Sequence, residues 1–254
     1  MDKQKVKQHF SSIASVYDKF ATPQARWGSK LISLLPQKLD AAAILDIGMG
    51  TGNLTIELAN VFKQAKIYGC DISSTMIECA RKKAGSRAYF DFSESDFEKM
   101  PYKNNFFDII FSNMSFQWSS DFKATLKEAS RVLKKGGKIY FTIPGKKTLK
   151  ESKTLFENNG LKWQSNHNFT DEETIKSLLK EAGFANTIIE THEEKLKFKD
   201  FLTFINWLKL TGSNTGVDTG LNGFNLGKAL IKLNKESNLK FTVTFEIQFV
   251  HAQK

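Results

Sequence analysis

The sequence has no stretch that approaches the roughly 18 consecutive apolar residues of a membrane-spanning helix. Its first ten residues, MDKQKVKQHF, are charged from position 2 and lack the apolar segment of a secretory signal. Only two cysteines occur, Cys70 and Cys79, and their spacing matches neither a CxxC pair nor a zinc pattern. We therefore expect two reduced thiols in a cytoplasmic protein that holds no metal and binds no membrane.

Positive charge is in excess and unevenly distributed. The chain carries a formal net charge of +10, and residues 1–43 hold seven Lys or Arg against three acids. Positive surfaces raise encounter rates with nucleic acid, anionic membranes or acidic proteins, although lysine-rich surfaces can also serve solubility alone. Hydrophobic residues make up 41% of the chain, which is enough for a sizeable core and excludes a disordered protein.

Apolar spacing predicts an α/β fold. After two predicted helices, 2–20 and 22–35, short apolar runs alternate with helical patterns as far as Pro144. The expected strands are 41–48, 66–73, 88–96, 106–113 and 138–144, and the helices between them are 53–62, 73–85 and 122–134. Such alternation is typical of a parallel sheet with right-handed crossovers.

Beyond Pro144 the pattern changes. Thr170 and Glu173 predict a capping box for a helix that ends at Gly183. There follow a strand (186–191), a helix (200–212), a Gly/Asn/Thr-rich loop (212–223), a helix near 226–234 and an alternating strand (240–251). The prediction is one domain with a doubly wound, mostly parallel, seven-stranded sheet. It comprises an N-terminal helical cap (1–40), a cofactor-binding core (41–145) and a helical lid with closing strands (146–254).

The strongest functional signal is a glycine-rich turn after the first predicted strand, Asp46-Ile47-Gly48-Met49-Gly50-Thr51-Gly52. Glycines let the backbone turn sharply and approach a ligand, and ligands of open α/β sheets lie beyond the carboxyl ends of the strands. A dinucleotide-binding turn has the spacing GxGxxG. Here the third glycine comes one residue early and Asn53 stands at the expected position, so the spacing disfavours a dinucleotide.

Polar residues also end the neighbouring predicted strands. Asp71 stands about 20 residues beyond the glycines and suits a pair of ribose hydroxyls. Ser95-Asp96-Phe97 and Ser112-Asn113 end the next two strands. Because the carboxyl ends of parallel strands meet at one edge of a sheet, these groups favour a compact nucleoside with an amino-acid tail.

The successive segments ILDIGMGTG, YGCDISSTMIECAR, SDFEKMPYKNNFFDIIFSN and EASRVLKKGGKIYF resemble the motifs of class I S-adenosylmethionine-dependent methyltransferases, over residues 44–145. The resemblance implies that the glycine turn carries the methionine part of S-adenosylmethionine, with S-adenosylhomocysteine as the product. Where many relatives have cysteine in the turn, this chain has Met49. The implied cofactor-binding residues are Asp46 near the amine, Gly48 and Gly50 in the turn, Asp71 with Ile72 at the ribose, Asp96 with Phe97 at the adenine, and Asn113 near the amine.

A narrower resemblance extends over nearly the whole chain. HFSSIASVYDKFATPQ, SNMSFQWSSD, TIPGKKTLKES, NHNFT and DFLTFINWLKLTGS are similar to segments of the malonyl-acyl-carrier-protein carboxyl O-methyltransferases of biotin synthesis. That family is implied to methylate the free carboxylate of malonyl-acyl-carrier protein or malonyl-CoA. The chain departs from the family at DTGLNGFNLGK, where relatives often carry a Gly-Arg element and a Leu-Thr pair.

The implied reaction needs no general base, because a carboxyl with a pKa of about 4 is already ionised at neutral pH. It needs groups that position the acceptor. Tyr17 could direct its hydroxyl at the acceptor, Gln117 and Trp118 could wall the transfer channel, and Arg26 or Lys209 could pair with the carboxylate. The alternative is that the aromatic residues only pack in the core and the two cations are ordinary surface charges.

The basic N-terminus gains a role under this resemblance. Acyl carrier proteins are acidic, so Lys3, Lys5, Lys7, Arg26 and Lys30 could steer docking. A methyltransferase for a free acid or a quinone ring, and an inert cofactor-binding protein, would share the same core motifs. Nucleic acid is not an expected partner, because SNMSFQW stands where a nucleic-acid enzyme would have an Asn-Pro-Pro-Tyr-type motif.

Overall fold

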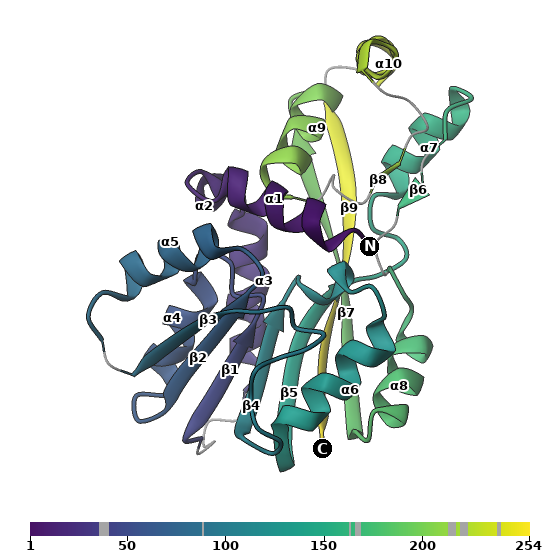
Figure 1. Cartoon of the computed structure of the whole chain (residues 1–254). Coiled ribbons are helices and arrows are strands. Elements are labelled where there is room, and N and C mark those ends of the chain that lie inside the picture. Colours follow the sequence, from purple (N-terminus) through teal and green to yellow (C-terminus); the bar gives the residue numbers. More distant parts are fainter. Residues whose placement is uncertain are drawn as a thin grey trace.

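The computed structural model describes residues 1–35, 41–87, 89–162, 164–165, 169–212, 217–218, 223–237 and 240–254. Its main sheet has seven strands in the order β3-β2-β1-β4-β5-β9-β7 (Figure 1). The strands are β1 (Ala43–Ile47), β2 (Lys66–Asp71), β3 (Phe90–Glu94), β4 (Phe107–Asn113), β5 (Leu133–Pro144), β7 (Ala185–Phe198) and β9 (Phe241–Gln253). The first five pair in parallel, and β9 pairs antiparallel with both β5 and β7. The predicted sheet is confirmed.

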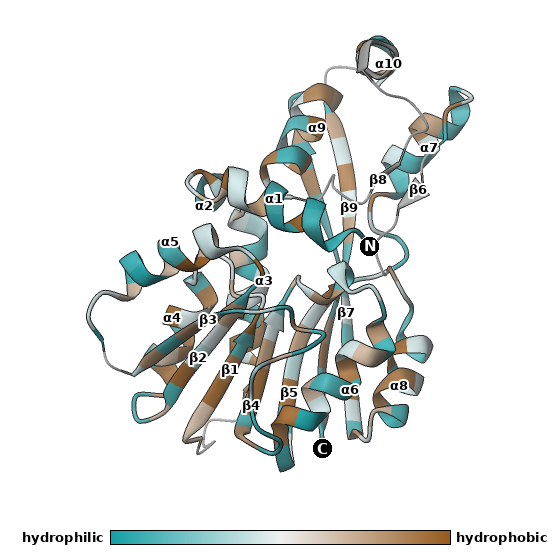
Figure 2. Ribbon diagram, viewed as in Figure 1, coloured by the Kyte–Doolittle hydropathy of each residue, from teal (hydrophilic) through white to brown (hydrophobic). Residues whose placement is uncertain are grey.

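Helices cover both faces of this sheet (Figure 1). Helices α3 (Thr22–Ser33) and α4 (Asn53–Val61) pack on one face, and α6 (Phe122–Val132) and α8 (Glu172–Glu181) pack on the other. Alternate residues of a strand point to opposite faces, so Ile44 joins the first core and Leu45 joins the second. Burial on both faces explains why the central strands β1 and β4 are largely apolar, whereas the edge strands β3 and β7 are partly exposed and more polar (Figure 2).

The other elements lie at the ends and edges of this core. They are α1 (Lys3–Ile13), α2 (Tyr17–Phe20), α5 (Ser74–Ala84), a 3-10 turn η1 (Phe116–Trp118), α7 (Lys150–Asn158), α9 (Phe201–Leu210), α10 (Gly223–Glu236), and the small sheet of β6 (Gln164–Ser165) with β8 (Val217–Asp218). The sequence did not predict α7 or the small sheet.

The predicted helix over residues 2–20 is wrong, because the chain forms two helices with a turn between them. The backbone N–H of Val16 donates to the carbonyl of Ile13 at 3.0 Å, and α2 begins at Tyr17. Ile13 is buried against Met76 of α5, as its place in the apolar stripe predicts. The break lets α1 lie along α5 while α2 turns to contact α3 and α9, which one straight helix could not do.

Strands β7 and β9 extend beyond the parallel strands as a two-stranded arm. β5 pairs with β9 only from Ile247 onward, whereas β7 pairs with it back to Phe241. α9 covers the arm, where Trp207 meets Phe245 with ring centres 5.6 Å apart. The sequence predicted only residues 186–191 of β7, because the charged run HEEKLK that follows hides the strand pattern.

Three local predictions need correction. The N-cap of α8 is Asp171, whose carboxylate accepts from the Thr174 N–H at 2.8 Å, in place of the predicted Thr170 capping box. β5 begins at Leu133, directly after α6, and not at residue 138. The predicted loop over 212–223 contains β8, and its residues 213–216 and 219–222 lie outside the described residues, as do 166–168 of the NHNFT segment. Within the described ranges, no helix has both the length and the apolarity to cross a bilayer.

Candidate functional site

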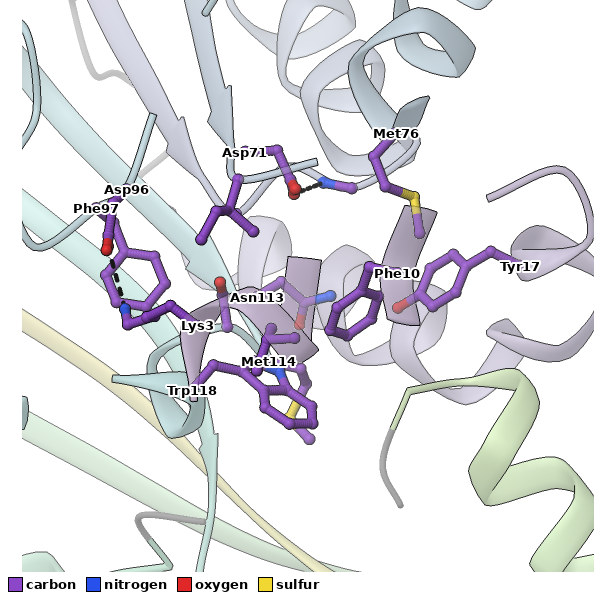
Figure 3. A pocket seen from close by; sticks show the side chains of 15 residues that line it. Lys3, Phe10, Tyr17, Asp71, Met76, Asp96, Phe97, Asn113, Met114 and Trp118 are labelled. Atoms are coloured by element: carbon purple, nitrogen blue, oxygen red, sulfur yellow. Dashed lines mark hydrogen bonds and ion pairs between the residues drawn. The ribbon is translucent and has the colours of Figure 1, made fainter. Parts of the chain in front are cut away.

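A cavity of about 590 Å³ lies at the carboxyl ends of β1, β2, β3 and β4, beneath α1 (Figure 3). Side chains of α1, α2, α5 and η1 complete its wall. Nine of the thirteen predicted site residues line it. They are Tyr17, Gly48, Gly50, Asp71, Ile72, Asp96, Phe97, Asn113 and Trp118, and Lys3, Val6, Phe10, Met76, Met114 and Ser115 complete the lining.

The glycine turn forms the inner wall of this cavity. Gly48 has φ +67°, and a Cβ added there would stand 1.8 Å from Ser115 Oγ. Gly52 has φ +82°, and its Cβ would stand 2.8 Å from the Cβ of Ala80 in α5. Both positions therefore need glycine, for the left-handed backbone and for the close approach of a neighbour. At Gly50 an added Cβ would meet nothing within 4 Å, so the backbone of the turn is open to the cavity at that position.

Asp71 ties the glycine turn to the end of β2. Its Oδ2 accepts from the Gly50 N–H at 2.9 Å, and its Oδ1 accepts from the Ser73 N–H at 2.9 Å. Burial raises the pKa of this carboxyl, and the backbone donors, Ser73 foremost, oppose the rise because they favour the charged form. Each carboxylate oxygen has a further lone pair, so Asp71 can also accept from a ligand.

The end of β3 provides the far wall, and α1 reaches it through a lysine. Lys3 Nζ lies 3.1 Å from Asp96 Oδ1, 2.9 Å from Glu98 Oε1 and 4.2 Å from the centre of the Phe97 ring (Figure 3). Asp96 also accepts from the Glu98 N–H at 2.9 Å. Phe97 therefore offers a flat apolar surface beside a hydrogen-bonding carboxylate, which suits a purine ring.

Asp46, also predicted to bind the cofactor, lies on the other side of the glycine turn. It lines a second cavity of about 550 Å³ that shares Tyr17, Gly48, Gly50 and Asn113 with the first. Asp46 is 1% exposed and accepts from the Thr55 hydroxyl at 2.7 Å. Burial raises the pKa of this carboxyl to about 7; the Thr55 hydrogen bond opposes the rise and the charge of Asp71 adds to it.

Gln24 of α3 also faces the second cavity. It is 7% exposed, and within the described part of the chain its Oε1 has no hydrogen-bond donor. A buried amide oxygen without a partner costs about 1–3 kcal/mol, so a group that binds here and donates to it gains that interaction. The two cavities adjoin at the residues they share, and Asp46 and Gln24 give the second cavity two buried hydrogen-bond acceptors.

Comparison with known proteins identifies the family. The model of a methyltransferase domain matches residues 45–141, which carry the glycine turn and the four strand ends. The malonyl-acyl-carrier-protein O-methyltransferase of Gallionella capsiferriformans is 30% identical over all of this chain and 91% of its own length. A second relative, the malonyl-acyl-carrier-protein O-methyltransferase 2 of Ilyobacter polytropus, is 31% identical over 85% of this chain and 83% of its own length. This chain belongs to the malonyl-acyl-carrier-protein O-methyltransferase family.

The fold agrees with that membership. The solved structure of phosphoethanolamine N-methyltransferase 2 from Haemonchus contortus, in complex with S-adenosyl-L-methionine, superposes with a TM-score of 0.60 at 20% identity. The match covers 90% of this chain and 52% of that one, and at this identity it shows the fold alone. The chain is thus an S-adenosylmethionine-dependent methyltransferase, as its motifs predicted.

In this methyltransferase, aromatic residues enclose the outer part of the first cavity. The Phe10 ring meets the Trp118 ring edge-on at 5.4 Å and the Tyr17 ring at 6.2 Å. Burial, with Asp71 and Asp18 nearby, raises the pKa of Tyr17 above its usual range, so its phenol stays protonated. Gln117 does not line either cavity; it is buried, and its amide donates to the Met114 carbonyl at 2.8 Å.

The structure does not bring Arg26 or Lys209 to these cavities. The guanidinium of Arg26 forms an ion pair with Glu194 of β7, on the outer side of α3. Lys209 is exposed on α9, and its carbonyl oxygen lies 2.8 Å from His9 Nε2. The sequence could not show that these two residues lie away from the cavities, because their neighbours in space, Glu194 and His9, are distant in the chain.

The lining residues that the sequence did not predict for the site include Phe10, Gln24 and Met76, and also Lys3, which was predicted only to steer docking. Gln24 closes the segment HFSSIASVYDKFATPQ, whose likeness to the family was the available signal. Lys3 and Phe10 carried no local signal, since a helix pattern does not say which distant strand ends the helix will cover.

Proposed function

We propose that this enzyme transfers a methyl group to the free carboxylate of a malonyl thioester, carried by acyl carrier protein or coenzyme A. The product is the methyl ester, at the start of pimeloyl and biotin synthesis in the cytoplasm. The full-length match to enzymes of that name carries the proposal, because it includes residues 1–44 and 142–254, outside the methyltransferase-domain match. Those segments build α1 and α2, whose Lys3, Val6, Phe10 and Tyr17 line the first cavity, and also α7, α9 and α10.

The described residues fit S-adenosylmethionine. Gly48 and Gly50 contribute backbone without side chains of their own to the wall, and Asp71 can accept from the ribose hydroxyls. Phe97 with Asp96 suits the adenine, Asp46 and Gln24 suit the amino-acid tail, and Ile72 and Asn113 complete the wall. When bound, this cofactor supplies an electrophilic methyl group on a positively charged sulfur, and S-adenosylhomocysteine remains. Neither the cofactor's binding nor the transfer requires a metal.

The acceptor side needs to orient a carboxylate and exclude water. The protonated Tyr17 hydroxyl can donate to one malonyl oxygen and leave the other free to attack. Phe10, Met114 and Trp118 form an apolar wall that keeps water out. Orientation of this kind can supply roughly 7–11 kcal/mol of the barrier reduction, and none of these roles requires proton removal.

The test is methyl transfer from methyl-labelled S-adenosylmethionine to four acceptors in parallel: malonyl-acyl-carrier protein, malonyl-CoA, free malonate and aconitate. We expect a base-labile methyl ester on one or both thioesters. Product on a free acid alone would overturn the proposal in favour of a small-acid methyltransferase. Cofactor binding without any methylated product would favour an inert binding protein.

A further inference from the structure

A methionine directly after β4 has a left-handed backbone. Met114 has φ +52°, a conformation that glycine adopts freely and that a residue with a Cβ adopts only at a cost. Three other non-glycine residues in the described part of the chain have a positive φ: Asn105 and Asn186, of a residue type that tolerates it, and Leu149 at the start of α7. Met114 alone of these four lines the first cavity. A strained residue beside a ligand cavity indicates that its side chain is needed there.

Both peptide groups of Met114 are held by hydrogen bonds. Its N–H donates to Thr142 Oγ1 at 2.9 Å and to the Thr142 carbonyl at 3.2 Å, and its own carbonyl accepts from the Gln117 amide at 2.8 Å. Thr142 is fully buried in β5, and its hydroxyl donates to Asn113 Oδ1 at 2.7 Å. These contacts fix the direction in which the Met114 side chain leaves the backbone.

The side chain of Met114 enters the first cavity from the side away from the proposed adenine wall. Met114 packs against the core that contains Trp207 of α9, whereas Phe97 packs against the core on the other face of the sheet. It lines the first cavity together with Phe10 and Trp118 (Figure 3) and does not line the second cavity, where the cofactor's amino-acid tail is proposed to bind. Met114 is therefore placed to meet the acceptor.

An apolar side chain in a fixed position can measure the length of an acceptor. A malonyl group has one methylene between its carboxylate and its thioester, a succinyl group has two and a glutaryl group three. To present the carboxylate at the same point, a longer group needs additional space in the cavity. One methylene in an apolar pocket changes kcat/KM by about 10- to 200-fold.

We propose that Met114 determines the acyl-chain specificity of the enzyme, because its side chain fills the space that a longer dicarboxylic acyl group would need. The proposal rests on the proposed function and adds to it the residue that selects the malonyl group. The left-handed backbone, held by Thr142 and Gln117, keeps the side chain at the depth that admits one methylene.

The test is Met114→Gly, which opens the space and relieves the backbone strain. The measurement is kcat/KM for malonyl, succinyl and glutaryl thioesters of both acyl carrier protein and coenzyme A. We expect the ratio of succinyl to malonyl kcat/KM to rise about tenfold or more over that of wild type. Met114→Ala should show the same rise, with a lower urea midpoint than Met114→Gly because it keeps a Cβ on the left-handed backbone. Met114→Leu, which has a similar volume, should stay within about threefold of the wild-type ratio.

The matched control for backbone relief is Asn105→Gly. Asn105 has the same φ of +52°, is exposed and lines neither cavity, so its replacement should leave the ratio unchanged. An equal loss of kcat/KM for all three acyl groups in Met114→Gly and Met114→Ala would overturn the inference and make Met114 a packing residue. A changed ratio in Asn105→Gly would overturn it as well. Failure of the proposed function is distinguishable, since wild type would then form no methyl ester on either malonyl thioester, and the inference would fail with it.

Discussion

The ammonium group of Lys3 lies 3.1 Å from the carboxylate of Asp96, and the contact joins the first helix to the end of β3 across the cavity. The same ammonium stands over the Phe97 ring. At its other end, α1 is held by Ile13 packed on Met76. The helix is therefore held over the cavity at both ends, by ion pairs at the end of β3 and by apolar contact with α5 at the other end.

Replacing Lys3→Met should loosen this cover. Lys3 is only 20% exposed, so its ion pairs and its contact with Phe97 together are worth about 1 kcal/mol. We expect bound S-adenosylhomocysteine to dissociate about three- to tenfold faster, measured by displacement of labelled ligand. The control is Lys5→Met on the same helix, where the exposed lysine pairs with Asp2 at 3.7 Å. Equal dissociation rates in both variants would show that the Lys3 contacts do not hold the cover.

Gly48→Ala should damage both stability and cofactor binding. The added Cβ would stand 1.8 Å from Ser115 Oγ on a left-handed backbone. Overpacking and the backbone strain together should lower the free energy of unfolding by about 2–4 kcal/mol, measured by urea denaturation. Gly227→Ala is the control, since an added Cβ there meets nothing within 4 Å and the residue is helical.

A second substitution tests the stated cause. Ser115→Gly removes the two nearest atoms and leaves the Ser115 Cα at 3.9 Å from the added Cβ. In the double variant Gly48→Ala with Ser115→Gly, we expect the steric part of the loss to be recovered, leaving about 1–2 kcal/mol for the left-handed backbone. If the double variant is no more stable than Gly48→Ala, the contact with the Ser115 side chain is not the cause of the lost stability.

The sheet and the cofactor side were predictable because their signals are local. Apolar runs that end in Asp46, Asp71 and Asn113 reveal buried strands with polar ends, and parallel topology then brings those ends together. Of the residues predicted to position the acceptor, the structure brings only some to the cavity. Tyr17 and Trp118 reach the cavity, whereas Arg26 turns to Glu194, because helix packing on the β7–β9 arm decides where α3 points its cations. The charged sequence of β7 hid that arm.

Asp46 should make stability fall as pH rises. Its pKa is about 7 in the folded protein, because burial disfavours the charge, and close to 4 in the unfolded chain. Between about pH 4 and pH 7, Asp46 is ionised in the unfolded chain but still protonated in the folded protein. Its contribution to the free energy of unfolding is therefore fully present below about pH 4 and is lost as the pH rises through about 7. The loss is on the order of 4 kcal/mol at most. Asp46→Asn keeps a neutral group, so its urea unfolding should depend less on pH between 5 and 8 than that of wild type.

The same ionisation should favour the cofactor. An ionised Asp46 attracts the ammonium of the amino-acid tail, so the Kd for S-adenosylmethionine should fall between pH 6 and pH 8. Asp46→Asn should bind more weakly at pH 8 and show a flatter profile. Asp91→Asn on strand β3, where the side chain pairs with Lys66 and is half exposed, is the control. Parallel profiles for wild type and Asp46→Asn would place the ammonium elsewhere.

Gln24→Met should separate a ligand-binding role from a structural one. The Gln24 amide oxygen is buried without a donor in the described part of the chain, so an apolar side chain of similar length removes a desolvation cost and leaves the fold intact. The free energy of unfolding should stay the same or rise by about 1 kcal/mol. The Kd for S-adenosylmethionine should nevertheless rise about tenfold, because the amide no longer meets the charged amino-acid tail in the second cavity. Gln64→Met, at an exposed position before β2, should change neither quantity. Loss of stability with unchanged cofactor affinity would make Gln24 a packing residue, and the second cavity would then need another occupant.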